Sequence, residues 1–355
     1  MESIQTAAFL SCRGYSLSDE EKRLFNQTRP AGITLFARNI ESREQVKHLI
    51  AEIKNTSGDD TLIAVDQEGG RVRRLKEPLT RAYAAQKQIG SLPPKEAKEA
   101  AKLHAGLIGR DLRDLGITVN FAPVLDVEHA NTTDALKGRC FSATPATVAT
   151  LGKLSIEEYK KTGVIPCIKH LPGHGLAQCD PHLGLPVIEA PRAELEPEFL
   201  PFRRCRNAPM GMTAHIVLTA IDPECPLTLS AKGIEQIIRQ DIGFTGFLIS
   251  DAIDMHALKG SALQKAQAAL KAGCDCVCYC MADIEEMREM AMSCPKLSDA
   301  ARERLDKAKQ ILHNEAETVV DDAERYAKLI SDTAVYCEKY DATEVLHQLQ
   351  RIKKC

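Results

Sequence analysis

The chain alternates short apolar runs with longer amphipathic stretches, and it does so about eight times. Short apolar runs bounded by turn residues are typical of buried parallel strands, and a period of about 3.6 residues is typical of helices. The runs expected to form strands lie near Ala8, Leu35 and Asn120, end at Asp66 and His170, surround His215 and Val277, and precede Asp251. The clearest helical periods cover residues 42–55, 95–116, 262–273, 283–293 and 297–312, with Ser42 as a helix cap and Gly273 as a helix stop. This alternation predicts strand–helix–strand units and a parallel sheet.

Eight strands that are each followed by a helix close most simply into a (β/α)8 TIM barrel, which is an α/β fold. Asp66, His170, His215 and Asp251 lie at the carboxyl ends of apolar runs, and this end of the strands carries the chemistry in such barrels. An open doubly wound sheet is the alternative, but the glycine-rich phosphate-binding turn that it would normally have after the first strand is absent. Since no linker interrupts the pattern, residues 1–355 are expected to form a single domain, with the barrel in about 1–315 and a C-terminal helical extension in about 316–355.

Composition and charge exclude several kinds of partner. Lys and Arg total 46 against 49 for Asp and Glu, a net charge of −3, so no basic surface is available to hold nucleic acid or an anionic membrane. The 44% hydrophobic and 27% charged residues are typical of a globular protein. The chain shows neither the signature of a secretory signal nor the roughly 20 apolar residues that would span a bilayer. These features predict a cytoplasmic protein.

The thirteen cysteines are an odd number in a long chain, which favours reduced thiols over a disulfide framework. Cys274, Cys276, Cys278 and Cys280 are spaced two apart and would line one face of a strand. Metal ligands more often come as C-x-x-C pairs on turns. We therefore interpret this row as buried thiols that act as small hydrophobic side chains.

A carboxylate, two glycines and three arginines follow the third apolar run, in VDQEGGRVRRL at residues 65–75. Gly69 and Gly70 permit a tight turn. Asp66 could accept from two adjacent hydroxyls of a ligand, while an arginine donates to a neutral oxygen. We interpret the segment as a ligand clamp. For the arginines taken singly, a solvated charge run is the alternative.

The segment KHLPGHGLAQCDPH, from Lys169 to His182, combines cations, glycines, histidines and a carboxylate directly after the fifth apolar run. A packed core does not need this mixture, whereas an acid–base loop does. Asp180 lies two residues before His182, so its carboxylate can bind one ring nitrogen, fix the tautomer and raise the basicity of the other nitrogen. The segment therefore predicts a general acid–base dyad.

Asp251, in LISDAIDM, adds a second carboxylate at the same end of the barrel. As a nucleophile it would attack an anomeric carbon and form a glycosyl-enzyme, and its alternative role is a helix cap. Asp254 is interpreted as a capping or solvated residue. Arg139 follows the fourth apolar run and could reach the same pocket. Together these features predict a glycosidase.

The motifs resemble those of glycoside hydrolase family 3, and specifically of its single-domain bacterial β-N-acetylglucosaminidases, or β-hexosaminidases, of peptidoglycan recycling. The family's loop reads KH-[FL]-PGHG, four residues and D-x-H, and KHLPGHGLAQCDPH matches it at every position. VDQEGGRVRRL, NFAPVLDV, MTAHIV and SDAIDM occur in the family's order, so the resemblance extends from about Gly32 to Gly273. Pro181 replaces a common serine and SDAI replaces the frequent SDDL; because proline fixes φ and lacks an N–H donor, loop mobility is the property that this change affects.

The resemblance implies a retaining, exo-acting enzyme with Asp251 as the nucleophile, His182 as the acid–base and Asp180 as its partner. It implies that the terminal N-acetylglucosamine is bound by Asp66, Arg74, Arg139, Lys169 and His170. It also implies no metal or organic cofactor, a monomer, and muropeptide substrates such as N-acetylglucosaminyl-anhydromuramyl peptides. Tryptophan is absent and aromatic residues make up 5% of the chain, so a pocket for one terminal sugar fits better than a stacking groove for long polysaccharides.

Three other functions would use the same residues. Phosphate could replace water as the acceptor, which would make the enzyme a β-N-acetylglucosaminide phosphorylase. A metal-dependent amidohydrolase could take its ligands from His170, His174, His182, His215 and Asp251, but the H-x-H pair usual on the first strand is absent. A sugar-binding protein with an inactive site is the third alternative, although both catalytic residues stand in their motifs.

Overall fold

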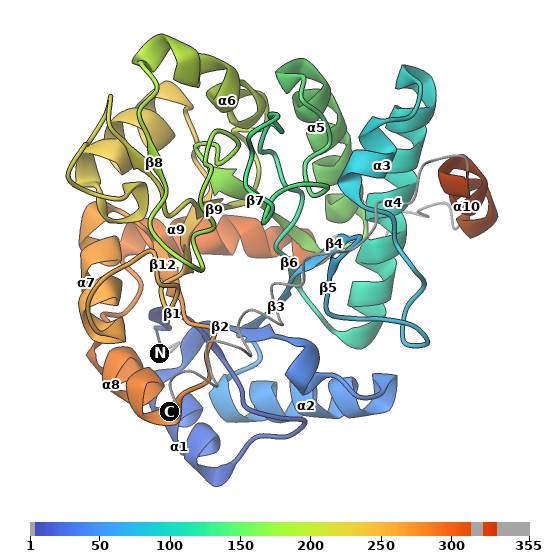
Figure 1. Cartoon of the computed structure of the whole chain (residues 1–355). Coiled ribbons are helices and arrows are strands. Elements are labelled where there is room, and N and C mark those ends of the chain that lie inside the picture. The colour runs from blue at the N-terminus through green and yellow to red at the C-terminus, as the bar shows by residue number, and fades with distance from the viewer. Residues whose placement is uncertain (1–3, 314–321, 332–355) are drawn as a thin grey trace.

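The computed structural model describes residues 4–313 and 322–331. Eight parallel strands close into a barrel in the order β1-β12-β11-β9-β7-β6-β3-β2, and helices surround it (Figure 1). Each apolar run that was expected to form a strand contributes one strand of the barrel. The TIM-barrel prediction is therefore confirmed, and the open doubly wound sheet is wrong.

The barrel strands are β1 (Thr6–Ser11), β2 (Pro30–Leu35), β3 (Leu62–Val65), β6 (Val119–Asn120), β7 (Ile165–Leu171), β9 (Met210–Thr213), β11 (Phe247–Ala252) and β12 (Cys276–Cys278). Two small sheets lie outside the barrel: β4 (Gln67–Gly69) pairs with β5 (Val72–Arg73), and β8 (Val187–Ile188) pairs with β10 (Val217–Leu218). These strands are too short to show a period in the sequence. They belong to the loops after β3, β7 and β9, so they shape the carboxyl end of the barrel.

The α-helices are α1 (Asp19–Thr28), α2 (Arg43–Ser57), α3 (Gln86–Gly90), α4 (Pro94–Leu115), α5 (Pro145–Lys161), α6 (Arg192–Arg204), α7 (Ala262–Ala272), α8 (Ile284–Ser293), α9 (Asp299–Lys309) and α10 (Ala323–Ser331). The described residues also form the 3-10 turns η1 (Ala37–Asn39), η2 (Leu227–Leu229) and η4 (Gln310–His313), and the π-helix η3 (Gly233–Asp241). The five predicted helical periods correspond to α2, α4, α7, α8 and α9. Ser42 caps α2 by accepting the Gln45 N–H, and Gly273 ends α7 at φ +116°, where a side chain would be strained.

Side chains along each strand alternate between the inside of the barrel and the layer beneath the helices. In β1, Ala7 and Phe9 pack inside the barrel, whereas Ala8 and Leu10 pack against the helices. Gly32 on β2 leaves room for the Phe9 ring, because a Cβ at that position would lie 2.3 Å from it. Full burial of a phenylalanine stabilises a fold by about 1.5–3 kcal/mol. The inner core thus depends on this pairing of a large and a minimal residue.

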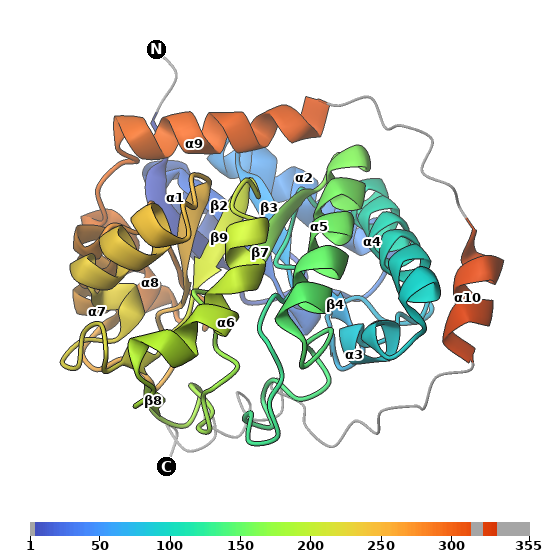
Figure 2. The ribbon, with the colours of Figure 1, turned by 90° about the horizontal axis from the view of Figure 1, so that it is seen from above.

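Helix α9 closes the amino-terminal end of the barrel (Figure 2). Its Ala301, Leu305 and Ala308 belong to the same apolar cluster as Phe9 inside the barrel. Just before the helix, Lys296 pairs with Thr6 at the start of β1. Helix α9 therefore covers this end of the barrel, and the pocket described below lies at the opposite end.

The predicted C-terminal extension is described only at 322–331, where α10 packs against α4. The rest of the extension lies outside the described residues. Within the ranges that the structure describes, every helix is too short or too polar to cross a bilayer.

The row of cysteines follows the prediction in part. Cys276 and Cys278 are buried inside the barrel, and Cys280 packs against the same cluster at the edge of the pocket. Cys274 instead belongs to the outer cluster. Because β12 begins only at Cys276, after the turn at Gly273, Cys274 does not share the inner face, and the prediction of one continuous row was wrong there.

Candidate active site

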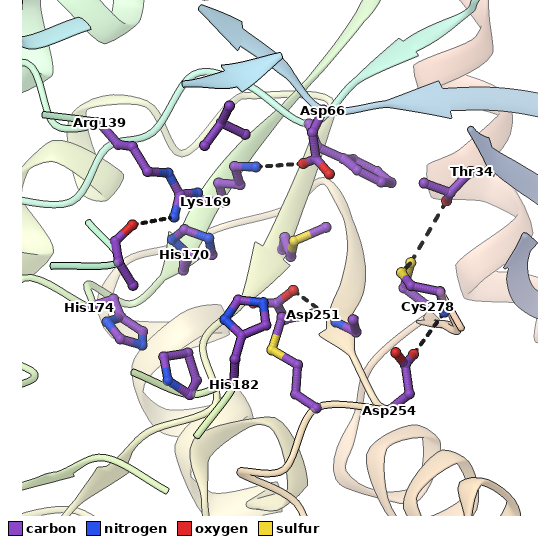
Figure 3. Close-up of a pocket in the computed structure, with 18 of the residues that line it drawn as sticks. Thr34, Asp66, Arg139, Lys169, His170, His174, His182, Asp251, Asp254 and Cys278 are labelled. Carbon is purple, nitrogen blue, oxygen red and sulfur yellow. Dashed lines mark hydrogen bonds and ion pairs between the residues drawn. The ribbon is translucent and has the colours of Figure 1, made fainter. Parts of the chain in front are cut away.

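The carboxyl ends of the barrel strands surround a pocket (Figure 3). The predicted site residues that line it are Asp66, Arg74, Arg139, Lys169, His170, His182 and Asp251. Asp180 contacts His182 directly. The apolar part of the lining includes Phe36, Phe121, Leu136, Met212 and Met255. The structure therefore brings the predicted site residues together from loops and strands that are far apart in the sequence.

Asp251 lies near the end of β11 and lines the same pocket as His182 (Figure 3). Its Oδ1 accepts a 2.8 Å hydrogen bond from the backbone N–H of Ala252. Burial acts to raise the pKa of Asp251, but His170, His215 and that N–H outweigh burial, so the pKa lies below its ordinary value. The carboxylate is therefore ionised at neutral pH, as a nucleophile needs to be.

His182 and Asp180 form the predicted dyad. Nδ1 of His182 donates to Oδ1 of Asp180 at 2.8 Å, and the backbone N–H of His182 donates to the same oxygen at 2.9 Å. Burial acts to raise the pKa of Asp180, and the two bonds from His182 outweigh burial and lower the pKa. The ionised carboxylate holds a proton on Nδ1, which leaves Nε2 to exchange a proton in the pocket.

Two carboxylates hold three cations at the side of the pocket formed by β3, β7 and the loop after β6. Asp66 accepts from Lys169 Nζ at 2.8 Å and from Arg74 Nη2 at 3.1 Å. Glu68 lies 2.7 Å from Lys169 Nζ and accepts from Arg139 through both oxygens, at 2.7 and 2.8 Å. We call Asp66, Glu68, Arg74, Arg139 and Lys169 the charge cluster. Removing one partner from a buried ion pair costs about 3–5 kcal/mol, so each member of the charge cluster fixes the others.

Glu68 was missed by the sequence reasoning. It is 2% exposed, and although burial acts to raise its pKa, Arg139 and Lys169 lower the pKa to about 2. It is absent from the lining of the pocket and supports the lining residues from behind. Charge balance could have revealed it, because Asp66 alone cannot neutralise the cations that the motifs bring together.

His170 is oriented by Asp126, a second residue that the sequence reasoning missed although it stands in NFAPVLDV. Nδ1 of His170 donates to Oδ2 of Asp126 at 2.7 Å, and the N–H of His174 donates to Oδ1 at 2.7 Å. Asp126 is fully buried, and the bonds from His170 and His174 outweigh that burial and lower its pKa. Nε2 of His170 is therefore the nitrogen left to meet a ligand.

His174 lines the pocket with both ring nitrogens lacking a hydrogen-bond partner in the part of the chain that the structure describes. Burial, and then the charge of His170, lower its pKa to about 4, so the ring is neutral at neutral pH. Buried polar atoms without partners are rare and point to a ligand or water. His174 thus adds polar groups to the pocket beyond the predicted set.

The three arginines of the clamp separate in the structure. Arg74 lines the pocket, as predicted. Arg71 donates to the backbone oxygens of Asp134 and Ala135, and Arg73 donates to that of Gly70. Arg71 and Arg73 therefore fix loops.

The interpretation of Asp254 as a capping or solvated residue was wrong. Ser261 caps the next helix, and Asp254 lines the pocket, where its Oδ1 accepts the Cys280 N–H at 2.7 Å. Burial raises the pKa of Asp254 against the opposing effect of that bond. In the turn that follows β11, where the Met255 N–H bonds to the Ala252 carbonyl, this side chain reaches the pocket, which helical spacing could not indicate.

His215 lies two residues after the end of β9, close to the predicted position, but it is not among the residues that line the pocket. Its Nδ1 pairs with Thr228 Oγ1 at 2.8 Å and its Nε2 with the Ala252 carbonyl at 3.0 Å. Both nitrogens are therefore occupied beside the backbone that carries Asp251. Over residues 4–313 and 322–331, no group of three or more histidine, cysteine or carboxylate side chains is placed to hold a metal ion. The ligand set of the amidohydrolase alternative is thus not assembled.

A buried carboxyl lies beneath the acid–base loop. Glu198 on α6 accepts from His129 Nε2 at 2.7 Å. Its other oxygen has no partner in the described ranges and lies 2.7 Å from the position that a Cβ on Gly175 would take. Burial raises the pKa of Glu198 to about 7, although His129 acts to lower it. Folding therefore favours the protonated form of this group.

Glu198→Gln is expected to stabilise the protein at about pH 8 more than at about pH 5. The folded pKa of about 7 lies above the ordinary 4.5, so the contribution of Glu198 to the free energy of unfolding falls as the pH rises through this window. Glutamine does not ionise, and the difference from wild type should reach about 1–3 kcal/mol above pH 7. Urea unfolding at both pH values measures it. Exposed Glu194→Gln on the same helix is the control, and an equal gain at both pH values would contradict the prediction.

The sequence model described as Glycosyl hydrolase family 3 N terminal domain matches residues 3–314. Among curated relatives, a β-hexosaminidase of Neisseria meningitidis serogroup B is 37% identical over 286 residues, which cover 78% of each chain. A β-hexosaminidase of Psychromonas ingrahamii is 35% identical over 279 residues, which cover 76% of this chain and 81% of the relative.

Solved structures also match this chain. Native NagZ from Neisseria gonorrhoeae superposes with a TM-score of 0.81 at 31% identity, covering 92% of this chain and 96% of that one. The same protein in complex with N-trifluoroacetyl-D-glucosamine also superposes with a TM-score of 0.81, covering 92% of this chain and 97% of that one. The structural match therefore covers nearly the full length of both chains.

Proposed function

Because the chain belongs to glycoside hydrolase family 3 and is a β-N-acetylhexosaminidase, we propose that its pocket removes a terminal non-reducing N-acetylglucosamine from β-glycosides with retention of configuration. The observation that carries the proposal is that Asp251 and His182 line one pocket together with Asp66, Arg74, Arg139 and Lys169 of the charge cluster. An ionised nucleophile and an oriented proton carrier are the two groups that a double displacement requires.

In the proposed complex the sugar hydroxyls bind the charge cluster. Asp66 accepts from hydroxyls while Lys169, Arg74 and Arg139 donate to hydroxyl or acetamido oxygens. These groups already satisfy one another, so they are held rigid before the sugar arrives. Such preorganisation reduces the entropy lost on binding.

In the first step, a carboxylate oxygen of Asp251 forms a bond to the anomeric carbon as the bond from that carbon to the leaving-group oxygen breaks. Nε2 of protonated His182 gives its proton to that oxygen, and Asp180 stabilises the cationic ring beforehand. The products of this step are the free alcohol, a glycosyl ester of Asp251 and neutral His182. A covalent intermediate divides one difficult displacement into two easier ones.

In the second step, neutral His182 takes a proton from water while the water oxygen attacks the anomeric carbon. The bond to Asp251 breaks, which restores the carboxylate and the protonated dyad and releases N-acetylglucosamine. Two inversions at one carbon give net retention. The low pKa of Asp251 also makes it a good leaving group in this step.

The finer parts of the proposal concern the setting of the reaction. We propose a single-domain monomer that acts in the cytoplasm on muropeptides from peptidoglycan recycling. Eleven cysteines are free thiols in the ranges described, most of them buried, which fits a reducing compartment. The charged and apolar sides of the pocket fit one amphipathic sugar ring at the end of a chain.

A chromogenic β-N-acetylglucosaminide and the matching β-glucoside, each assayed with and without phosphate, test this function. Chromophore release from the N-acetyl substrate, with the β-anomer of the sugar as first product by NMR, is the expected result. Release that requires phosphate and yields a sugar 1-phosphate would identify a phosphorylase instead. Binding of N-acetylglucosamine without turnover of any substrate would contradict the proposal and indicate a sugar-binding protein.

Asp66→Asn is expected to lower kcat/KM for the N-acetylglucosaminide by about 10- to 100-fold. The amide keeps the shape but cannot accept two charged donors and two hydroxyls at once, and it leaves Lys169 and Arg74 less well neutralised. Steady-state kinetics measure the change. Asp60→Asn, at an exposed carboxylate before β3, is the matched control and should keep wild-type constants. Wild-type constants in Asp66→Asn would exclude Asp66 from sugar binding.

A further inference from the structure

Helix α10 places one tyrosine in the protein core, next to the segment that carries Glu68 of the charge cluster. Tyr326 is buried against α4, with its ring 5.8 Å from that of His104 and 6.3 Å from that of Tyr83. Tyr326 and His104 are 222 residues apart in the sequence, so this contact joins the C-terminal part of the chain to the barrel. The mechanism above gives neither residue a role.

Hydrogen-bond donors and acceptors in this group can be assigned without ambiguity. The Glu68 carbonyl, 2.9 Å from His104 Nε2, can only accept, so Nε2 carries the proton. Burial lowers the pKa of His104 to about 4, and in the resulting neutral ring Nδ1 is an acceptor. Tyr326 therefore donates its hydroxyl proton to Nδ1 at 2.8 Å, while its oxygen accepts the Ala84 N–H at 3.0 Å. The hydrogen bonds therefore run in one direction: the Ala84 N–H donates to the Tyr326 oxygen, the Tyr326 hydroxyl donates to His104 Nδ1, and His104 Nε2 donates to the Glu68 carbonyl.

Glu68 joins this hydrogen-bond chain to the pocket. Its carbonyl accepts from His104, and its carboxylate binds Arg139 and Lys169 at 2.7–2.8 Å. A displacement of the Glu68 backbone would therefore move the carboxylate that both cations share. The adjoining turn has little freedom, because a Cβ on Gly69 would lie 2.3 Å from the Ala84 carbonyl oxygen and 2.7 Å from the His104 ring.

We propose that Tyr326 and His104 are positioning residues for sugar binding. They fix the backbone at Glu68, whose carboxylate sets Lys169 and Arg139 in place. This role rests on the proposed function, in which those two cations bind the sugar. It makes α10 part of the active-site support, because Tyr326 on this helix holds the His104 ring through the hydrogen bond to Nδ1.

Tyr326→Phe tests the role of the hydroxyl. The ring remains, but Nδ1 of His104 loses its donor and the Ala84 N–H loses its acceptor. We expect KM for the chromogenic β-N-acetylglucosaminide to rise by about 3- to 10-fold while kcat stays within about twofold, because the hydrogen bonds that are lost support binding groups and leave Asp251 and His182 untouched.

Tyr83→Phe is the matched control. Tyr83 is in the same aromatic group and also makes a buried hydrogen bond, at 2.5 Å to Asp111 Oδ2, but its hydroxyl lies outside the chain that ends at Glu68. The same atom is removed, so the two variants should lose comparable thermal stability, while KM should stay at the wild-type value in Tyr83→Phe. Equal KM in the two variants would overturn the proposal.

Two changes at His104 provide the second measurement. Glutamine offers both an N–H donor and an oxygen acceptor, so His104→Gln should retain KM within about threefold, whereas His104→Leu should raise KM at least as much as Tyr326→Phe. A wild-type KM in His104→Leu would also overturn the proposal. Failure of the proposed function is distinguishable, because the wild-type enzyme itself would then release no chromophore.

Discussion

Asp251→Gly is expected to lower kcat/KM for a chromogenic β-N-acetylglucosaminide by on the order of 10⁴-fold or more, which is typical of the loss of a nucleophile. Without the carboxylate no glycosyl ester can form. Azide should restore turnover, since this small anion fits the space that the side chain leaves and attacks the anomeric carbon directly. Attack from that face gives the α-glycosyl azide. NMR of the product and steady-state rates with and without azide measure both effects.

Asp254→Asn is the control for the loss of a carboxyl in the same pocket. The amide keeps the shape of the side chain, and its Oδ1 can still accept the Cys280 N–H. We expect a loss of about tenfold or less, without any effect of azide. If Asp251→Gly kept substantial activity, or if azide gave the β-product with that variant, Asp251 would not be the nucleophile.

The sequence was sufficient for the barrel because its signal is periodic and repeated. Each of the eight apolar runs forms a barrel strand, and the terminal polar residues Asp66, His170 and Asp251 all reach the pocket. Elements without a period escaped prediction, such as β4 and β5, which span only 67–69 and 72–73. They depend on tertiary contacts, including the bond from the Gly70 N–H to the Tyr83 carbonyl.

The candidate site was predictable where a motif carries the chemistry, and not where a residue acts through another. His182 and Asp180 are two residues apart, so their hydrogen bond follows from local geometry. Glu68 and Asp126 stand inside recognisable motifs, but their importance lies in bonds to partners more than 40 residues away. Tyr326 lies in a helix with no motif, and only the fold brings it to His104. Residues that act by positioning other residues are therefore identified from the structure and not from the sequence.

Loop geometry marks another limit of the sequence. Asp254 lies three residues after Asp251, and its expected place on the following helix led to the capping or solvated interpretation. The chain forms a turn after β11, and both side chains line the pocket. The apolar pattern does not distinguish a turn in a loop from the first turn of a helix, because neither has enough apolar residues to show a period.

His182→Gln is expected to reduce kcat/KM by about 10²- to 10⁴-fold for substrates with a poor leaving group, such as a disaccharide, because its bond cleavage requires proton transfer. The dinitrophenolate of a dinitrophenyl glycoside leaves as a stable anion without being protonated. Formation of the glycosyl-enzyme from this substrate should therefore be much less affected, and the ester of Asp251 should accumulate. Pre-steady-state bursts and mass spectrometry of the trapped ester measure this difference. Azide should again accelerate turnover, since it needs no general base.

The stereochemistry of the azide product distinguishes the two catalytic residues. With Asp251 present, azide attacks the glycosyl ester and gives the β-glycosyl azide, the opposite of the product expected from Asp251→Gly. Asp180→Asn serves as the intermediate case: it keeps a hydrogen-bond acceptor for His182 Nδ1 but removes the charge, so the same dependence on the leaving group should persist with a smaller loss. A loss that is equal for good and poor leaving groups would assign His182 to sugar binding and leave the proton transfer to another group.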